Sequence, residues 1–268
     1  MFEALILGVV QGVFEWLPVS SEGVIVLIET QIFGSTLTEA VRFALFLHLG
    51  TVLAAIVYLR KDIVALSVSS FRSLFEGRSL EGPARFIFIG TLASGVLGLG
   101  FMWILEEAEA AVMQNFRLIN LLIGLLLLVT AYTQFSKKKT GARVFSSLGS
   151  KDGFMVGIAQ GFAALPGVSR SGTTVAALVA LGFKESEALK ASFLLGIPIV
   201  IIANILLNVN EMHFSLEAIL SLATSFVFGL LTIHSLLIFA KRVHFGWFIL
   251  FFALLVIGAS FLPVAVNV

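Results

Sequence analysis

The 268-residue chain contains no cysteine, only five prolines and few charged side chains. Because cysteine is absent, disulfide bonds and thiolate metal sites are excluded. Charged residues make up 12% of the sequence, whereas hydrophobic residues make up 59%. A soluble domain covers its surface with more charge than this, so the composition predicts a membrane-embedded protein. The net charge of +1 gives no reason to expect a nucleic acid as a partner.

Long apolar segments recur along the chain. A helix needs roughly 20 apolar residues, at about 1.5 Å of rise each, to cross about 30 Å of hydrocarbon. The apolar N-terminus lacks the basic region and small-residue cleavage site of a signal peptide, so we expect it to belong to the mature fold. Six segments are predicted to span the membrane: Val41–Leu59, Arg85–Leu105, Phe116–Phe135, Ala191–Leu207, Leu216–Ala240 and Phe245–Leu262.

Two further apolar stretches, residues 2–32 and 153–183, are interrupted by polar residues. The interruptions read Pro18-Val-Ser-Ser-Glu-Gly23 and Pro166-Gly-Val-Ser-Arg-Ser-Gly172. Each piece beside an interruption is about half the length that a crossing needs. Non-helical backbone at membrane depth is tolerated only where protein buries it or where it lines a wet cavity. We therefore predict two re-entrant helical hairpins, each of which enters and leaves the membrane on one side.

The two interrupted stretches also resemble each other. Gly8-Val-Val-Gln-Gly12 matches Gly157-Ile-Ala-Gln-Gly161, and both runs lead to a Pro, a Ser cluster and a Gly. The step from Gln11 to Gly23 equals that from Gln160 to Gly172. This similarity predicts an internal duplication within a single membrane domain, residues 1–268. Repeat one covers residues 1–135 (hairpin 2–32 plus three spans), repeat two covers residues 152–268 (hairpin 153–183 plus three spans), and the basic loop 136–151 links them.

Charge in the connections alternates along the chain. The 60–85 and 136–151 connections are basic and Lys241-Arg242 joins the last two spans, whereas the intervening connections carry Glu or little charge. By the positive-inside rule the basic connections are cytoplasmic and both termini lie outside. The predicted fold class is thus an all-α integral membrane protein, multi-pass in the cell membrane, with an inverted-topology repeat of six transmembrane helices and two re-entrant helical hairpins that meet near the midplane.

Each interruption is suited to hold an anion. Pro stops a helix or occupies its first turn, and Ser is a favoured N-cap. The second half of each hairpin therefore presents free N–H groups and the positive end of its dipole to the interior. Arg170 adds a permanent positive charge and a planar fork of donors matched to phosphate oxygens. Ser169, Ser171 and Thr174 add neutral donors.

Carboxylates come from the first hairpin. Gln11 and Glu15 are four residues apart, so they share a helical face that points toward the interruption, and Glu22 follows the two serines. A carboxylate in the hairpin next to Arg170 predicts either a buried ion pair or an acid/base–phosphate clamp. Charges inside a membrane are costly and usually functional.

Gln11-x-x-x-Glu15 with the following Pro18-Val-Ser-Ser, and Pro166-Gly-Val-Ser-Arg-Ser-Gly-Thr-Thr174, resemble the two signatures of the undecaprenyl-pyrophosphate phosphatase family, the bacitracin-resistance type. The resemblance spans nearly the whole chain. It implies hydrolysis of a polyprenyl pyrophosphate to the monophosphate and inorganic phosphate, which regenerates the lipid carrier for cell-envelope sugars. The sequence departs from the family at Val24, where members usually have a His implicated in activity.

The resemblance and the two interruptions together suggest roles. Glu15 acts as a base or holds a divalent cation (Mg²⁺ or Ca²⁺), Ser21 or a water beside it attacks phosphorus, and Arg170 stabilises transition-state charge. No organic cofactor is expected. Glu22 either balances the dipole of its helix or replaces the missing His as base. The predicted substrate-binding residues are Gln11, Ser20, Glu22, Ser169, Ser171 and Thr174.

Other functions stay open at this point. Inverted repeats with broken helices are also a transporter architecture, so a polyprenyl-phosphate flippase or anion transporter using the same midplane site is the alternative. A protein that only binds the anion is the third. Predicted partners are a polyprenyl pyrophosphate and membrane lipids; the polyprenol and the oligomeric state, a homo-oligomer included, are undetermined. His48 and His234 are interpreted as interhelical hydrogen-bonding residues rather than ligands.

Overall fold

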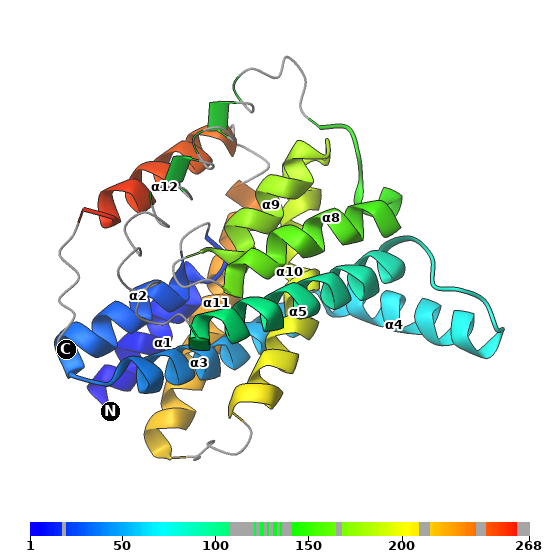
Figure 1. Cartoon of the computed structure of the whole chain (residues 1–268). Coiled ribbons are helices and arrows are strands. Elements are labelled where there is room, and N and C mark those ends of the chain that lie inside the picture. The colour runs from blue at the N-terminus through cyan, green and yellow to red at the C-terminus, as the bar shows by residue number, and fades with distance from the viewer. Residues whose placement is uncertain are drawn as a thin grey trace.

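The computed structural model describes residues 1–17, 20–107, 141–164, 168–208, 215–239 and 245–261, with isolated residues between 121 and 135. The regular elements of this part of the chain are helices (Figure 1). They are α1 (Phe2–Phe14), α2 (Ser21–Ile28), a π-helical turn (Glu29–Phe33), α3 (Leu37–Tyr58), α4 (Arg60–Phe75), α5 (Gly82–Glu107), 3-10 turns at Phe145–Ser147 and Phe162–Ala164, α8 (Ser150–Gly161), α9 (Arg170–Ala180), α10 (Glu185–Asn208), α11 (Leu216–Phe239) and α12 (Phe245–Ala259).

Four helices are long and apolar enough to cross a membrane, and they confirm four of the six predicted spans. These candidate spans are Glu39–Tyr58 in α3, Gly82–Phe101 in α5, Glu185–Asn208 in α10 and Leu216–Ile238 in α11. The predicted span 116–135 lies mostly outside the described residues. The last predicted span forms α12, whose 15 residues at about 1.5 Å each reach less than the roughly 30 Å of a hydrocarbon core.

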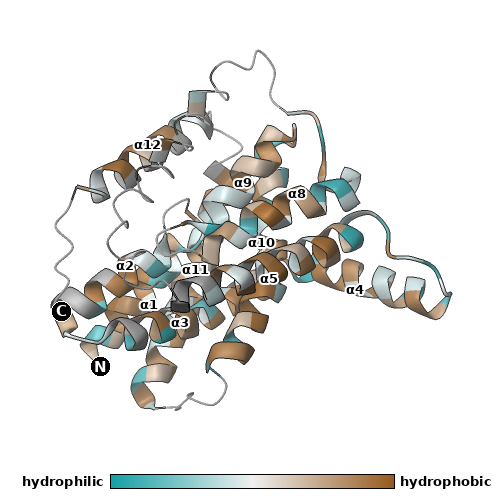
Figure 2. Cartoon of the chain, in the orientation of Figure 1, coloured by the Kyte–Doolittle hydropathy of each residue, from teal (hydrophilic) through white to brown (hydrophobic). Residues whose placement is uncertain are grey.

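Large apolar side chains on the outside of the bundle agree with a lipid environment. On α5 the exposed apolar residues recur every three or four positions and so form a stripe along one face. Figure 2 shows this helix as mainly hydrophobic along its length. A membrane would cover such a stripe, whereas water would not. Its members are Phe88, Leu92, Val96, Leu99 and Trp103.

Both predicted interruptions fall between two separate helices. The chain leaves α1 at Phe14 and starts α2 at Ser21, and it leaves α8 at Gly161 and starts α9 at Arg170. The two prolines themselves, Pro18 and Pro166, lie outside the described residues. With 8 to 13 residues each, these four helices are all too short to cross about 30 Å of hydrocarbon.

Glycines allow α1 to pack closely on α11, and α8 on α5. A Cβ atom at Gly12 would lie 2.6 Å from the backbone nitrogen of Gly229 in α11. A Cβ atom at Gly157 would lie 2.6 Å from the carbonyl oxygen of Gly90 in α5. Contacts this short require glycine, so α1 and α8 are each held against a long helix in the other half of the chain, as Figure 1 shows for α8 and α5.

Buried amides fix α3 against α10. Asn204 donates from Nδ2 to the carbonyl of Leu45 at 2.9 Å, and Asn208 donates to the carbonyl of Arg42 at 3.1 Å. The main apolar core lies beside this pair of helices and includes Phe193 of α10. Because interhelical hydrogen bonds restrict sliding and rotation, they set the direction in which α3 presents its side chains.

The 60–85 connection contains a helix that the sequence analysis did not predict. Residues Arg60–Phe75 form α4, no residue of which is buried. Its apolar side chains at Val64, Val68 and Phe71 are exposed and share one face. The spacing of these residues is helical, whereas the basic residues around them are typical of a connection between membrane spans.

Candidate functional site

The end of α1 is anchored where the first interruption begins. Glu15 follows the helix directly, and its backbone N–H donates to the carbonyl of Gln11 at 3.0 Å. The indole of Trp16 donates to the carbonyl of Gly229 at 2.9 Å and packs edge-on against Phe193, with 4.8 Å between ring centroids. These contacts to α11 and α10 hold the Glu15 backbone in place and direct its side chain into the bundle.

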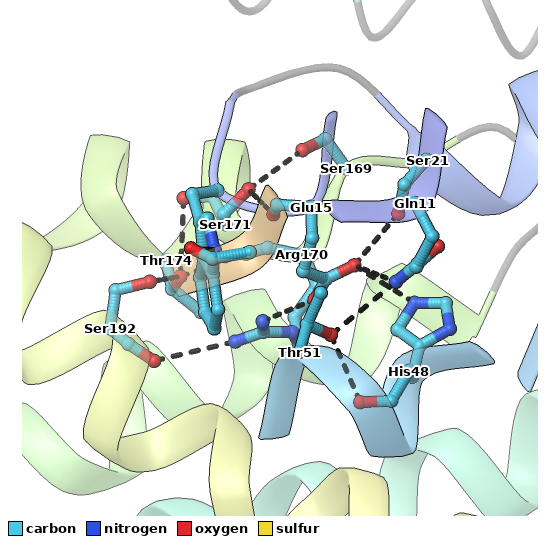
Figure 3. Close-up of polar contacts among 12 residues, drawn as sticks. Gln11, Glu15, Ser21, His48, Thr51, Ser169, Arg170, Ser171, Thr174 and Ser192 are labelled. Atoms are coloured by element: carbon cyan, nitrogen blue, oxygen red, sulfur yellow. Dashed lines mark hydrogen bonds and ion pairs between the residues drawn. The ribbon is translucent and has the colours of Figure 1, made fainter. Parts of the chain in front are cut away.

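The Glu15 carboxylate is the centre of a buried polar cluster (Figure 3). Arg170 donates from Nη2 to Oε1 at 2.7 Å. Ser21 donates to Oε2 at 2.7 Å, Gln11 donates to Oε2 at 2.9 Å, and Nε2 of His48 lies 3.0 Å from the same oxygen. These side chains come from α1, α2, α3 and α9, so the fold brings together four helices at one carboxylate. Its cationic neighbours favour the ionised form of Glu15.

Both short helices that begin at the site have a serine N-cap, as the sequence predicts. The hydroxyl of Ser20 accepts from the backbone N–H of Gly23 at 3.1 Å, and that of Ser169 accepts from Gly172 at 3.1 Å. The remaining first-turn N–H groups have no partner within their own helix. Together with the helix dipoles, they make this region favourable for an anion.

Ser169 and Ser171 connect the two interruptions. The hydroxyl of Ser171 donates to the carbonyl of Leu17 at 2.8 Å and lies 3.1 Å from the carbonyl of Glu15. Ser169 lies 3.3 Å from Ser171, oxygen to oxygen. The start of α9 is therefore bonded to the chain that follows α1, which keeps Arg170 beside Glu15.

The Arg170 guanidinium fills a space left by a glycine. Its Nη1 lies 3.4 Å from the carbonyl oxygen of Ser192, and a Cβ atom at Gly196 would lie 1.9 Å from that same nitrogen. Thr174, one turn further along α9, is fully buried. Its hydroxyl donates to the backbone carbonyl of Arg170 at 2.8 Å and lies 2.6 Å from the hydroxyl oxygen of Ser192.

A pocket of about 290 Å³, a volume that includes its open mouth, adjoins this cluster. Glu15, Ser21 and Arg170, the three predicted catalytic residues, all line it. The predicted substrate-binding residues divide into two groups. One group lines the cavity: Ser20, Glu22, Ser169 and Ser171. The other group is fully buried beside it, where Gln11 donates to the Glu15 carboxylate and Thr174 donates to the backbone carbonyl of Arg170.

The site fits an anion better than a resident metal ion. Both oxygens of Glu15 already accept from protein donors. Among the residues that the structure describes, no group of three His, Cys, Asp or Glu side chains could hold a metal ion. A divalent cation held by Glu15 stays a prediction of the sequence.

Two residues at the site were missed by the sequence analysis. His48 was interpreted as an interhelical hydrogen-bonding residue, yet it lines the cavity and contacts Glu15. Gly196 gave no signal at all, since a lone glycine in an apolar helix usually serves helix packing. For His48 a signal existed, because an ionisable residue within a membrane span is by default a functional candidate.

The fold and the site together define a multi-pass helical membrane protein with a buried Arg–Glu–Ser cluster whose chemistry suits a phosphate group. Comparison with known proteins agrees with this class. The chain belongs to the bacitracin resistance protein BacA family, whose sequence profile matches residues 4–258.

Curated relatives match over most of their length. A protein of Methanococcoides burtonii is 38% identical, over 97% of this chain and 98% of its own. One of Haloarcula marismortui is 39% identical over 90% of each chain, and one of Myxococcus xanthus is 35% identical over 81% of this chain and 71% of its own. Each of these three proteins is named an undecaprenyl-diphosphatase.

Proposed function

We propose that this protein is an undecaprenyl-diphosphatase, which hydrolyses a polyprenyl pyrophosphate of the undecaprenyl type to the monophosphate and inorganic phosphate. The proposal rests on the contacts of the Glu15 carboxylate. It accepts a hydrogen bond from Ser21 and forms an ion pair with Arg170, and all three residues line one cavity. A base, a nucleophile and a phosphate-binding cation thus meet at one point. The family and the names of the relatives support the same activity.

In the proposed reaction the terminal phosphate binds between Arg170 and the first turns of α2 and α9. Glu15 accepts the proton of the Ser21 hydroxyl, to which it is hydrogen-bonded at 2.7 Å. The serine oxygen bonds to the terminal phosphorus while the bond from this phosphorus to the bridging oxygen breaks, and the polyprenyl monophosphate leaves. Water then hydrolyses the phosphoserine and releases inorganic phosphate. Arg170 and the N–H groups stabilise the charge on the transferred group.

We further propose that the two halves are inverted repeats, each with a re-entrant hairpin, α1–α2 and α8–α9. Two correspondences support this. The caps Ser20–Gly23 and Ser169–Gly172 have the same geometry. The glycines of α1 pack on α11, and those of α8 pack on α5, so each hairpin contacts the opposite half. In this arrangement both termini lie outside, and the lipid tail leaves sideways into the bilayer.

Phosphate release in detergent tests the function. We expect the purified wild-type protein to release inorganic phosphate from a C55 pyrophosphate in micelles. The assay is run without added cation, with Mg²⁺ and with Ca²⁺, and release under any of these conditions supports the function. A flippase or transporter needs two compartments and releases none, and a protein that only binds the anion retains it without turnover. A Ser21→Ala variant that keeps wild-type turnover would show that water attacks directly instead of the serine.

The space that Gly196 leaves for Arg170 gives a second prediction. In a Gly196→Ala variant the new methyl group occupies the position of Nη1, and the flexible guanidinium moves away from Glu15. We expect kcat/KM to fall about 100-fold, the size of effect that small misplacements of reacting groups produce. The temperature of thermal unfolding should also fall, because the buried Glu15 carboxylate loses one of its cationic partners, so rates are compared at a temperature where both proteins are folded.

Gly95→Ala is the matched control for this variant. Among the described residues, a Cβ atom there would meet Cδ1 of Ile199 at 3.9 Å, which is ordinary contact, and no other atom within 4 Å. Wild-type activity in Gly196→Ala would show that Arg170 does not need its present position.

A further inference from the structure

His48 is a cavity residue that the reaction above does not use. It is carried by α3, lies 8% exposed, and lines the same cavity as Glu15, Ser21 and Arg170 (Figure 3). Of the contacts that α3 makes with the site, this one reaches the reacting carboxylate directly, at 3.0 Å from Oε2. The imidazole therefore touches the group that accepts the proton of the nucleophile.

Both ring nitrogens of His48 face oxygen acceptors. Nδ1 lies 2.6 Å from the carbonyl oxygen of Ala44, and Nε2 lies 3.0 Å from the carboxylate of Glu15. A neutral imidazole has one donor nitrogen and one acceptor nitrogen, whereas an imidazolium has two donors. A backbone carbonyl cannot donate, and Glu15 is the ionised partner of Arg170. The geometry therefore matches a doubly protonated, positively charged His48.

The two cations hold Glu15 from opposite ends. Arg170 bonds to Oε1, while His48 and Ser21 bond to Oε2. With both oxygens fixed, the carboxylate cannot rotate away from the serine hydroxyl. A second positive charge beside the cavity also favours an anionic substrate whose charge increases during phosphoryl transfer.

We propose that His48 is a positioning residue of the hydrolytic site, active as an imidazolium, which holds Oε2 of Glu15 on Ser21 and adds a second cation beside the diphosphate. The proposal deepens the function proposed above and rests on it. It assigns a role to α3, which carries none of the signature residues of the two interruptions.

Variants of His48 test the role in turnover. We expect His48→Ala and His48→Gln to lower kcat about 100-fold, as loss of a group supporting proton transfer does, while KM changes much less. Imidazole added to His48→Ala should restore part of the activity. His234→Gln is the matched control, because His234 bonds to Tyr58 between α3 and α11 and does not line the cavity.

A pH profile separates the charged role from a merely structural one. The groups that face His48 are Glu15 from α1, Glu22 from α2 and, across Glu15, Arg170 from α9. The two carboxyl groups gain protons as the pH falls, and Arg170 stays charged. Loss of wild-type kcat with rising pH is therefore expected from His48, and His48→Gln should lack this alkaline limb.

The protonation state can be measured without turnover. In protein labelled with ¹⁵N-histidine, NMR should show one histidine whose two ring nitrogens are both protonated near neutral pH, and Glu15→Gln should remove that signature. A neutral imidazole in the wild type overturns the proposal. If the wild type is active, two further results overturn the proposal. One is that kcat of the His48 variants stays within threefold of the wild type. The other is that the variants lose activity but keep the wild-type pH profile and are not rescued by imidazole. A wild type that releases no phosphate refutes the hydrolase function instead.

Discussion

An Arg170→Ala variant is expected to release phosphate from a polyprenyl pyrophosphate at least about 1,000-fold more slowly than the wild type, the loss typical of removing an arginine that stabilises a transferred phosphoryl group. Arg170 is the cation at the start of α9; its Nη2 donates to the Glu15 carboxylate at 2.7 Å and its Nη1 lies 3.4 Å from the carbonyl oxygen of Ser192. The remaining donors of its fork can bind phosphate oxygens. Initial rates of phosphate release in detergent measure the effect.

Two companion variants define this result. Arg170→Lys keeps the charge but loses the planar fork, so it should recover only part of the activity. Arg72→Ala removes a largely exposed arginine of α4, the side chain of which pairs with Glu76, and should leave the rate unchanged. Wild-type turnover in folded Arg170→Ala would reduce Arg170 to a structural clamp and remove the basis of the proposed function.

A Glu15→Gln variant is expected to lose between about 100-fold and 10,000-fold in kcat, the range found for general bases. The amide keeps the size of the side chain but cannot accept the proton of Ser21. KM should not rise, because removing a negative charge beside an anionic substrate does not weaken its binding. Steady-state kinetics that resolve kcat from KM make the measurement.

The opposite result would identify Glu15 as a mere counter-ion. If the carboxylate only neutralised Arg170, its loss would free the guanidinium for the substrate and turnover would be kept. Glu217→Gln is the matched control, since Glu217 is an exposed carboxylate that pairs with the amino terminus at 3.8 Å. Its replacement should change neither kinetic constant.

Local chemistry made much of this site predictable from the sequence. Proline and serine in an apolar stretch indicate where a helix stops and the next begins, and the structure starts α2 and α9 directly after serine caps, Ser20 and Ser169, within the two interruptions. A carboxylate and a guanidinium that share a membrane interior must be paired, and Glu15 and Arg170 lie 2.7 Å apart. The first inference depends on residues within one short segment. The second depends on the high energetic cost of an unpaired buried charge.

The rest depended on how distant helices face each other. Whether His48 points to lipid, to another helix or into a cavity is decided by the rotation of α3, which hydrogen bonds from Asn204 help to set. Gly196 is explained only by the path of the Arg170 side chain. The helix in the 60–85 connection was missed for a different reason. Its apolar residues have helical spacing, but its basic residues are typical of a loop between membrane spans.

The long sequence separation between Glu15 and Arg170 has a consequence for biogenesis. The two residues are 155 positions apart, so the carboxylate is synthesised well before its guanidinium partner. A buried carboxylate that lacks one of its cationic partners is destabilising by several kcal/mol, and until α9 is made the described partners of Glu15 include His48 but not Arg170. The half-made protein is therefore destabilised at this point until α9 arrives, and the chemistry that serves turnover also favours completion of the second half.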